Sequence, residues 1–187
     1  LKSDALQTSP LLLIQGPNVR LTGLRIEGPD PDRGIQHWRE SFLGRYRDKR
    51  QGLSGHEYYY RRPAARGVYA GFGGLEVDNC ELSGWSLTAV FLAEGEGHRI
   101  HHNYIHHNQR QGLGYGVSHR TAFSVIEYNL FAWNRHSIAG SGRSPSGYIA
   151  RHNVEQGPSL SHNFDMHGGM ARKDRTSTAG TRIEIYN

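Results

Sequence analysis

The chain of 187 residues has the length of one domain. Its 22 Lys and Arg outnumber its 17 Asp and Glu, which gives a formal charge of +5 and favours acidic partners. A single Cys excludes an intramolecular disulfide, and the lack of any run of about 18 apolar residues excludes a transmembrane helix.

One short pattern recurs along the chain, beginning at residues 21–26. In the later copies an Asn, or a residue in its place, stands between apolar positions. These copies centre on one column of residues: Cys80, Asn103, Asn129 and Asn153. The column advances by 23, 26 and 24 residues, and a period of this length is typical of stacked structural repeats.

Each repeat contains short apolar or β-branched runs bounded by Gly, Asn and Ser, which predict strands rather than helices. One repeat of about 24 residues cannot bury its own apolar face, so equivalent strands are expected to pair in parallel between stacked repeats. We therefore predict an all-β fold, a right-handed parallel β-helix (a solenoid) of about six coils. It would occupy residues 1–187 as a single domain.

The Ile-x-x-Asn-x-Ile pattern with trailing Gly resembles the right-handed parallel β-helix repeats of the pectate-lyase-like superfamily. The resemblance covers residues 12–28 and 68–187. It implies the fold and an extracellular or cell-surface location, although the sequence contains no signal peptide. The superfamily includes polysaccharide lyases, glycoside hydrolases, uronate epimerases, phage tailspikes and non-catalytic surface proteins, so the resemblance alone does not identify a reaction.

The Asn column has a structural explanation. An Asn at a repeat corner can bond backbone groups of the turn and stack on the Asn of the next repeat. It also tolerates the left-handed backbone that such corners need. We therefore assign the column to structure, and we expect Cys80 to occupy it as a small buried residue rather than as a reactive thiol.

Residues 29–67 interrupt the repeat with a basic and aromatic inserted arm. Loops of this length are usually functional or disordered. Arg makes bidentate contacts with carboxylate or sulfate, and Tyr and Trp offer apolar faces to sugar rings. The arm is predicted to bind an acidic polysaccharide, with four candidate side chains: Trp38, Tyr59, Arg61 and Arg62. The alternative is an arm packed on the β-helix or against another subunit.

Ten of the twelve His lie between residues 98 and 167. A 26-residue offset aligns three segments that begin at Arg110, His136 and His162. Stacked repeats would place those three side chains in one column, with Tyr115, Ser141 and His167 in a second. The candidate catalytic residues are Arg110, His119, Arg135, His136 and His162, and the candidate substrate contacts here are Tyr115 and His167.

A column of Arg and His beside a basic groove suits elimination at a uronate residue. The reaction needs a cation to neutralise the carboxylate, a base to remove the C5 proton and an acid for the leaving oxygen. In the lyases that the chain resembles, Lys or Arg is often the base, and Ca²⁺ held by Asp or Glu often neutralises the carboxylate. The repeats lack such an acid cluster, which favours His chemistry and ranks hydrolysis by paired carboxylates lower. The alternative is a solvated ladder of stacked His side chains.

The densest cluster of candidate ligands lies at residues 161–168. His162, Asp165 and His167 are candidate ligands for a divalent metal, because imidazole with carboxylate suits Zn²⁺. Their spacing matches no established motif, and the sequence requires no cofactor. In a second interpretation, Asp165 orients His162 as a base.

Residues 169–179 form a second, shorter inserted loop. The chain opens at Leu1 and stops at Asn187 in mid-pattern, so we expect part of a longer chain whose open β-helix ends allow self-association. The leading hypothesis is a secreted lyase acting on an acidic polysaccharide. The alternative is a non-catalytic β-helical surface, tailspike or filament module that binds glycans or mediates assembly. No nucleic-acid module is recognisable, so nucleic acid is not an expected partner.

Overall fold

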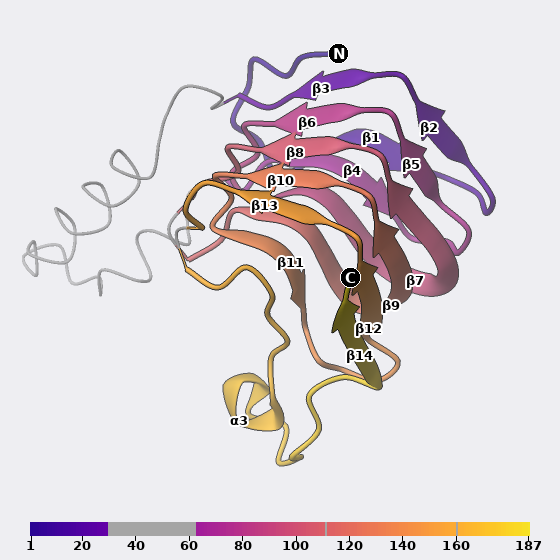
Figure 1. The fold of residues 1–187 in the computed structure, drawn as a ribbon, viewed down its shortest axis with the longest axis vertical. Coiled ribbons are helices and arrows are strands. Elements are labelled where there is room, and N and C mark those ends of the chain that lie inside the picture. Colours follow the sequence, from indigo (N-terminus) through magenta and orange to yellow (C-terminus); the bar gives the residue numbers. More distant parts are fainter. Residues whose placement is uncertain (30–62, 111, 160) are drawn as a thin grey trace, which may run out of the picture.

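The computed structural model describes residues 1–29, 63–110, 112–159 and 161–187. The fold is all-β, as predicted, with its strands in two sheets and one helix of four residues. Every pairing between strands of the described residues is parallel (Figure 1). The four candidate residues of the inserted arm lie outside the described residues: Trp38, Tyr59, Arg61 and Arg62.

Nine strands form the larger sheet. They are β1 (Pro10–Ile14), β2 (Arg20–Thr22), β4 (Arg66–Ala70), β5 (Glu76–Asp78), β7 (Thr88–His101), β9 (Tyr115–Glu127), β11 (His136–Gly140), β12 (Gly147–Arg151) and β14 (Arg182–Tyr186). The smaller sheet contains β3 (Arg25–Glu27), β6 (Glu81–Ser83), β8 (Tyr104–His106), β10 (Leu130–Ala132) and β13 (Val154–Gln156).

Equivalent positions of successive repeats lie side by side in both sheets. In the smaller sheet, the strand order is β13, β10, β8, β6 and β3, so each repeat pairs with the next. The larger sheet repeats this arrangement for β14, β12, β9 and β7. The parallel pairing that the 23- to 26-residue period predicted is therefore confirmed.

The core is built from columns of equivalent apolar side chains. One column of the smaller sheet contains four fully buried side chains: Ile26, Leu82, Ile105 and Phe131. A column of the larger sheet contains Val77, Ile100, Ile126 and Ala150. Burying a large aliphatic or aromatic side chain contributes about 1.5–3 kcal/mol, so these columns are a main source of stability.

Asn side chains link successive repeats at one corner. Asn129 Oδ1 accepts hydrogen bonds from the backbone and side-chain N–H groups of Asn103, at 3.0 and 2.9 Å. Asn153 accepts the same two bonds from Asn129, at 3.0 Å each. Asn103 in turn accepts the backbone N–H of Cys80 at 2.9 Å, and Leu24 N–H donates to Cys80 Sγ at 3.4 Å. The predicted Asn ladder and the buried, structural Cys80 are confirmed.

The left-handed backbone was expected at the Asn of each corner, but it lies at the residue before each ladder position. Its φ is +69° at Gly23, and +52° to +55° at the next four positions, which are Asn79, His102, Tyr128 and His152. A left-handed conformation costs a residue with a Cβ roughly 1–2 kcal/mol, and the ladder hydrogen bonds offset that cost. The rings at these positions also stack, with centroids 5.2 Å apart for His102 and Tyr128 and 5.1 Å apart for Tyr128 and His152.

A second ladder, which the sequence analysis missed, lies at another corner. Asn108 Oδ1 accepts the backbone N–H of Trp85 at 2.8 Å, and Asn134 Oδ1 accepts the Asn108 side-chain amide at 2.8 Å. The preceding residues, His107 and Trp133, again have positive φ values, of +53° and +57°. The repeats that contain Trp85, Asn108 and Asn134 are thus linked by side-chain hydrogen bonds at two corners.

A carboxylate interrupts the apolar column of the smaller sheet. Glu155 of β13 lies beside Phe131 of β10, in the register position that apolar residues occupy in the earlier repeats. Its Oε2 accepts the Ser137 hydroxyl at 2.8 Å, while its buried Oε1 has no hydrogen-bond partner among the described residues. Burial raises the pKa of Glu155 to about 7, and the Ser137 hydrogen bond opposes this shift.

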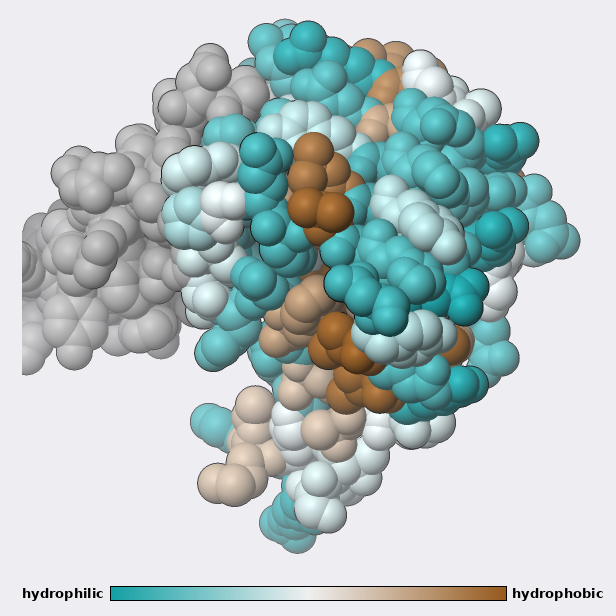
Figure 2. All heavy atoms as spheres, viewed as in Figure 1, coloured by the Kyte–Doolittle hydropathy of each residue, from teal (hydrophilic) through white to brown (hydrophobic). Residues whose placement is uncertain are grey.

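Apolar side chains are also exposed at the β13 and β14 end of the sheets. Val154 is 59% exposed and Ile185 is 52% exposed, although Ile185 belongs to the register column of the buried Ala150. Figure 2 shows apolar surface gathered over this end.

The short helix α3 (Gly169–Arg172) lies within the predicted insertion 169–179. No helix among the described residues is both long and apolar enough to cross a membrane.

We expect Asn129→Ala to lower the free energy of unfolding by about 2–4 kcal/mol, because two N–H groups of Asn103 and the Ile100 carbonyl lose their partner. Urea denaturation followed by circular dichroism would measure this loss. Asn153→Ala is the matched control, since its side chain is only partly buried and should cost less. Equal losses, or no loss at Asn129, would contradict a ladder that carries stability.

We expect Glu155→Gln to alter the pH dependence of stability. The folded-state pKa of Glu155 lies above its ordinary value of 4.5, so its protonated form stabilises the fold below that pH. This contribution is lost as the pH rises through about 7. Between pH 4.5 and 8 the native chain should lose about 1–2 kcal/mol more than the variant, after allowance for partial solvent exposure.

Urea midpoints of both proteins at the two pH values would measure this difference. Glu184→Gln is the control, because that carboxylate is paired with Arg182 at the edge of the sheet. Parallel pH profiles for the native chain and Glu155→Gln would show that Glu155 does not cause the effect.

Candidate active site

A pocket of ≈170 Å³ lies over β7, β9 and β11. Its base follows one register column, in which Phe91 lies beside Ser118 and Ser118 lies beside Ala139. The other residues that line it are Leu87, Tyr115, His119, Gly140, Ser141 and His167. Three candidate site residues are therefore brought together in this pocket: Tyr115, His119 and His167.

His167 is paired with a carboxylate at the pocket wall. Its Nε2–H donates to Asp165 Oδ2 at 3.1 Å, and its side chain is 49% exposed. This hydrogen bond raises the pKa of His167, with burial acting in the opposite direction, and the same bond lowers the pKa of Asp165. Because Asp165 occupies Nε2, the Nδ1 atom of His167 is left for a ligand, as in a base oriented by a carboxylate.

The segment that carries His167 is held against β11 by backbone and side-chain bonds. The His167 N–H donates to the Gly140 carbonyl at 3.0 Å. Arg172 Nη1 donates to the His167 carbonyl at 2.6 Å and to the Ser141 carbonyl at 3.2 Å. The Arg172 side chain is only 6% exposed, so it acts as a fixed clamp between the two segments.

The predicted column of Arg110, His136 and His162 is wrong at its first position. β11 pairs with β9 so that His136 lies beside Tyr115. The rings of Tyr115 and His136 stack at 5.5 Å, and those of His136 and His162 stack at 5.3 Å. The offset from Tyr115 to His136 is 21 residues, whereas the 26-residue offset does hold from His136 to His162.

The predicted second column is wrong at its first position for the same reason. The Ser141 N–H donates to the His119 carbonyl at 2.8 Å, which aligns Ser141 with β9 near residue 119 rather than with Tyr115. Ser141 and His167 nevertheless both line the pocket.

His136 is buried with one ring nitrogen committed. Its Nδ1–H donates to the His162 carbonyl at 2.6 Å, which leaves a lone pair on Nε2, 4.0 Å from Asp165 Oδ2. Burial lowers the pKa of His136 to about 4, and the positive charge of Arg135 adds to this effect. His136 is therefore neutral at physiological pH, while His162 stacks on it with an exposed side chain.

His119 has both ring nitrogens engaged. Nδ1–H donates to the Ala139 carbonyl at 2.9 Å, so Nε2 accepts the Ser124 hydroxyl at 2.7 Å. Burial lowers its pKa to about 4. The imidazole supplies a fixed polar wall of the pocket, and its lone pair is already used by Ser124.

Arg110 and Arg135 contact backbone carbonyl groups and do not line the pocket. Arg110 is fully buried, and its Nη1 donates to the Pro63 carbonyl at 2.8 Å. Arg135 Nη1 lies 3.5 Å from the Leu113 carbonyl. Neither side chain lines the pocket.

A different arginine lies beside a residue of the pocket base. Arg66, the first residue of β4, places its guanidinium 5.5 Å from the ring centroid of Phe91, a residue that lines the pocket. Its Nη1 donates to the Thr8 carbonyl at 2.8 Å, and burial lowers its pKa. The sequence analysis placed Arg66 in the insertion and missed this role, which only the pairing of β4 with β7 reveals.

Among the described residues, the predicted metal ligands His162, Asp165 and His167 do not form a group whose ligand atoms all lie within 4.8 Å of one another. Asp165 bonds His167, and His162 lies beside His136 instead. Within the described ranges, three ligand atoms lie within 4.8 Å of one another at another place: Glu76, Asp78 and His101. The sequence showed no acid cluster in the repeats, because the convergence of these side chains depends on the pairing of β5 with β7.

Comparison of the chain with family models, curated proteins and solved structures found no match. The fold and the site geometry are therefore the basis for assigning a function.

We expect Asp165→Asn to lower the pKa of His167, because the hydrogen bond to the Asp165 carboxylate raises it in the native chain. An NMR titration of the histidine ring protons would measure both proteins. Glu184→Gln is the control, because Glu184 is paired with Arg182 rather than with His167, and it should leave the pKa of His167 unchanged. An unchanged titration of His167 would show that Asp165 does not orient it.

Proposed function

We propose that the two parallel sheets belong to a right-handed parallel β-helix of about six coils, similar to those of the pectate-lyase-like superfamily. The parallel pairing of equivalent positions and the ladders of Asn at two corners support this architecture. The expected location is extracellular or at the cell surface.

The proposed function is elimination at uronate residues of an acidic polysaccharide. The observation that carries it is the pair of His167 and Asp165 at the wall of a pocket whose apolar base contains Phe91. The guanidinium of Arg66 lies 5.5 Å from the centroid of the Phe91 ring. A histidine whose Nδ1 is unbonded among the described residues, and a guanidinium, are the two groups that the first step of this reaction needs.

In the proposed elimination step, each of these groups has one role. Arg66 neutralises the uronate carboxylate, which acidifies the proton on C5. His167 Nδ1 takes that proton, and Asp165 stabilises the imidazolium that forms. The C5–H electrons become the C4=C5 double bond as the C4–O bond breaks, and the leaving oxygen takes a proton from an acid. The Tyr115 hydroxyl, in the pocket wall, is the candidate acid.

The other candidate residues have supporting roles in this proposal. His136 and His162 extend the ring stack beyond Tyr115 and fix its orientation. His119 forms part of the pocket wall, and burial, together with the positive charge of Arg135, keeps His136 neutral. The candidate contacts from the inserted arm would bind the sugars on either side of the cleaved bond.

The alternative function is a non-catalytic β-helical surface, tailspike or filament module that binds glycans or mediates assembly. The exposed apolar end at β13 and β14 favours it, because β14 is an edge strand that pairs only with β12 among the described residues. An edge strand with exposed Ile183 and Ile185 can associate with another chain. A module of this kind would retain polysaccharide without shortening it.

The test is ultraviolet absorbance of the unsaturated uronate, measured with pectate, alginate, glucuronan and glycosaminoglycans. We expect the native chain to produce a rising signal that falls at least 100-fold in His167→Ala, since general base catalysis contributes roughly 10²–10⁴-fold. A His136→Ala, His162→Ala double variant should lose activity through disorder of the stack.

His152→Ala is the control and should keep the native rate, because its ring lies at a corner away from the pocket. A flat signal across the panel, together with retention of polymer in a binding assay, would favour the alternative function. Activity that survives in His167→Ala would remove His167 from the role of base.

A further inference from the structure

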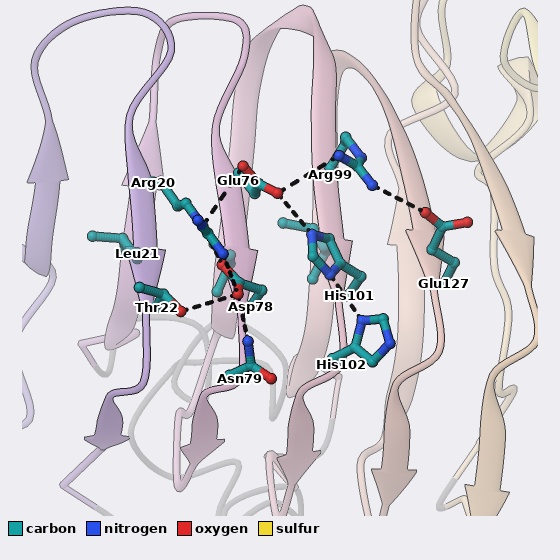
Figure 3. Close-up of polar contacts among 12 residues, drawn as sticks. Arg20, Leu21, Thr22, Glu76, Asp78, Asn79, Arg99, His101, His102 and Glu127 are labelled. Carbon is teal, nitrogen blue, oxygen red and sulfur yellow. Dashed lines mark hydrogen bonds and ion pairs between the residues drawn. The ribbon is translucent and has the colours of Figure 1, made fainter.

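Strands β2, β5 and β7 carry a cluster of ionisable side chains on one face (Figure 3). Glu76 and Asp78 are two residues apart on β5, so they share that face, while Val77 between them is buried in the core. The register places Arg20 beside Glu76 and His101 beside Asp78. The cluster shares no residue with the pocket described above.

Three potential metal ligands converge in this cluster. One atom each from Glu76, Asp78 and His101 lies within 4.8 Å of the other two, and His101 Nε2 is 2.9 Å from Glu76 Oε1. Zinc binds imidazole nitrogen and carboxylate oxygen at about 2.0–2.2 Å, so its ligand atoms lie roughly 3–4 Å apart. Small side-chain movements are therefore sufficient to close the three atoms around one ion.

The guanidinium of Arg20 supplies the positive charge next to these carboxylates, where a metal ion would bind. Arg20 Nε and Nη2 lie 2.8 and 2.9 Å from the two oxygens of Asp78, and Nε lies 3.8 Å from Glu76 Oε2. The Asp78 side chain has no exposed surface, so its negative charge requires a positive partner. The Arg20 side chain is 57% exposed and can move into solvent when another cation takes its place.

We propose that Glu76, Asp78 and His101 bind a divalent transition-metal ion, with Zn²⁺ as the best fit, in exchange for the guanidinium of Arg20. The imidazole ligand favours zinc over calcium or magnesium, which prefer oxygen alone. Zinc takes the lone pair of His101 Nε2, so the imidazole proton lies on Nδ1, beside His102 Nδ1. The site is independent of the proposed lyase activity.

The surrounding side chains suit this exchange. His102 Nδ1 lies 2.9 Å from His101 Nδ1, and such a partner on the second ring nitrogen orients metal-binding histidines. Arg99 lies 3.6 Å from both Glu76 and Glu127, so it keeps Glu127 as its partner when zinc neutralises Glu76. No new unpaired charge is created among these groups.

The test is titration with zinc chloride at pH 7.5, followed by isothermal calorimetry, on the native chain and its variants. We expect Arg20→Ala to bind one Zn²⁺ at least tenfold more tightly than the native chain, because the competing cation is gone. His101→Ala and Glu76→Gln should each lose this binding.

Arg25→Ala is the matched control, since Arg25 is an exposed arginine of the neighbouring strand β3 that lies near Glu81. It should bind zinc as the native chain does. Equal affinity in Arg20→Ala and the native chain would overturn the proposal, as would zinc binding that persists in both His101→Ala and Glu76→Gln. Zinc binding that is lost instead in His167→Ala would place the ion in the pocket.

Discussion

Hydrogen bonding between equivalent positions of successive repeats is the constraint on which the rest of the molecule depends. The strands of the smaller sheet have only three residues each, too few to be stable without neighbours. The Asn side chains at the corners fix each repeat relative to the next, because one Asn satisfies backbone groups of two repeats. Side chains far apart in sequence, such as Phe91 and His167, line one pocket only when this register holds.

The same register creates two environments of different polarity. Over β7, β9 and β11 it collects an apolar base with a few histidines, where burial keeps His119 and His136 neutral. Over β2, β5 and β7 it collects charges of both signs, where Asp78 stays ionised because Arg20 binds it. Stacked parallel strands allow this separation, since each register column can carry its own chemistry.

The sequence predicted the parts of the structure that follow from a constant period. The Asn ladder, the buried Cys80 and the parallel strands all depend on the 23- to 26-residue spacing, which the chain keeps at that corner. The predicted histidine columns are wrong at their first positions, Arg110 and Tyr115, because the offset between β9 and β11 shortens to 21 residues. The period at one corner does not determine the offset at another. The inserted arm departs from the period, so its binding role stays a prediction.

Arg66 and the cluster of Glu76, Asp78 and His101 were missed for another reason. Each is an ordinary charged residue in sequence, and only strand pairing brings it to its partner. A carboxylate and an imidazole that are 25 residues apart carry no local motif.

The rings at the first corner explain why these positions are not all glycine. Tyr128 lies between His102 and His152, with ring centroids 5.2 and 5.1 Å away. Glycine would adopt the left-handed backbone of this corner without strain, but it has no side chain with which to contact the next repeat. Stacked rings add attraction between repeats beyond the area that they bury. The corner therefore accepts a strained backbone at each turn and gains cohesion along the stack.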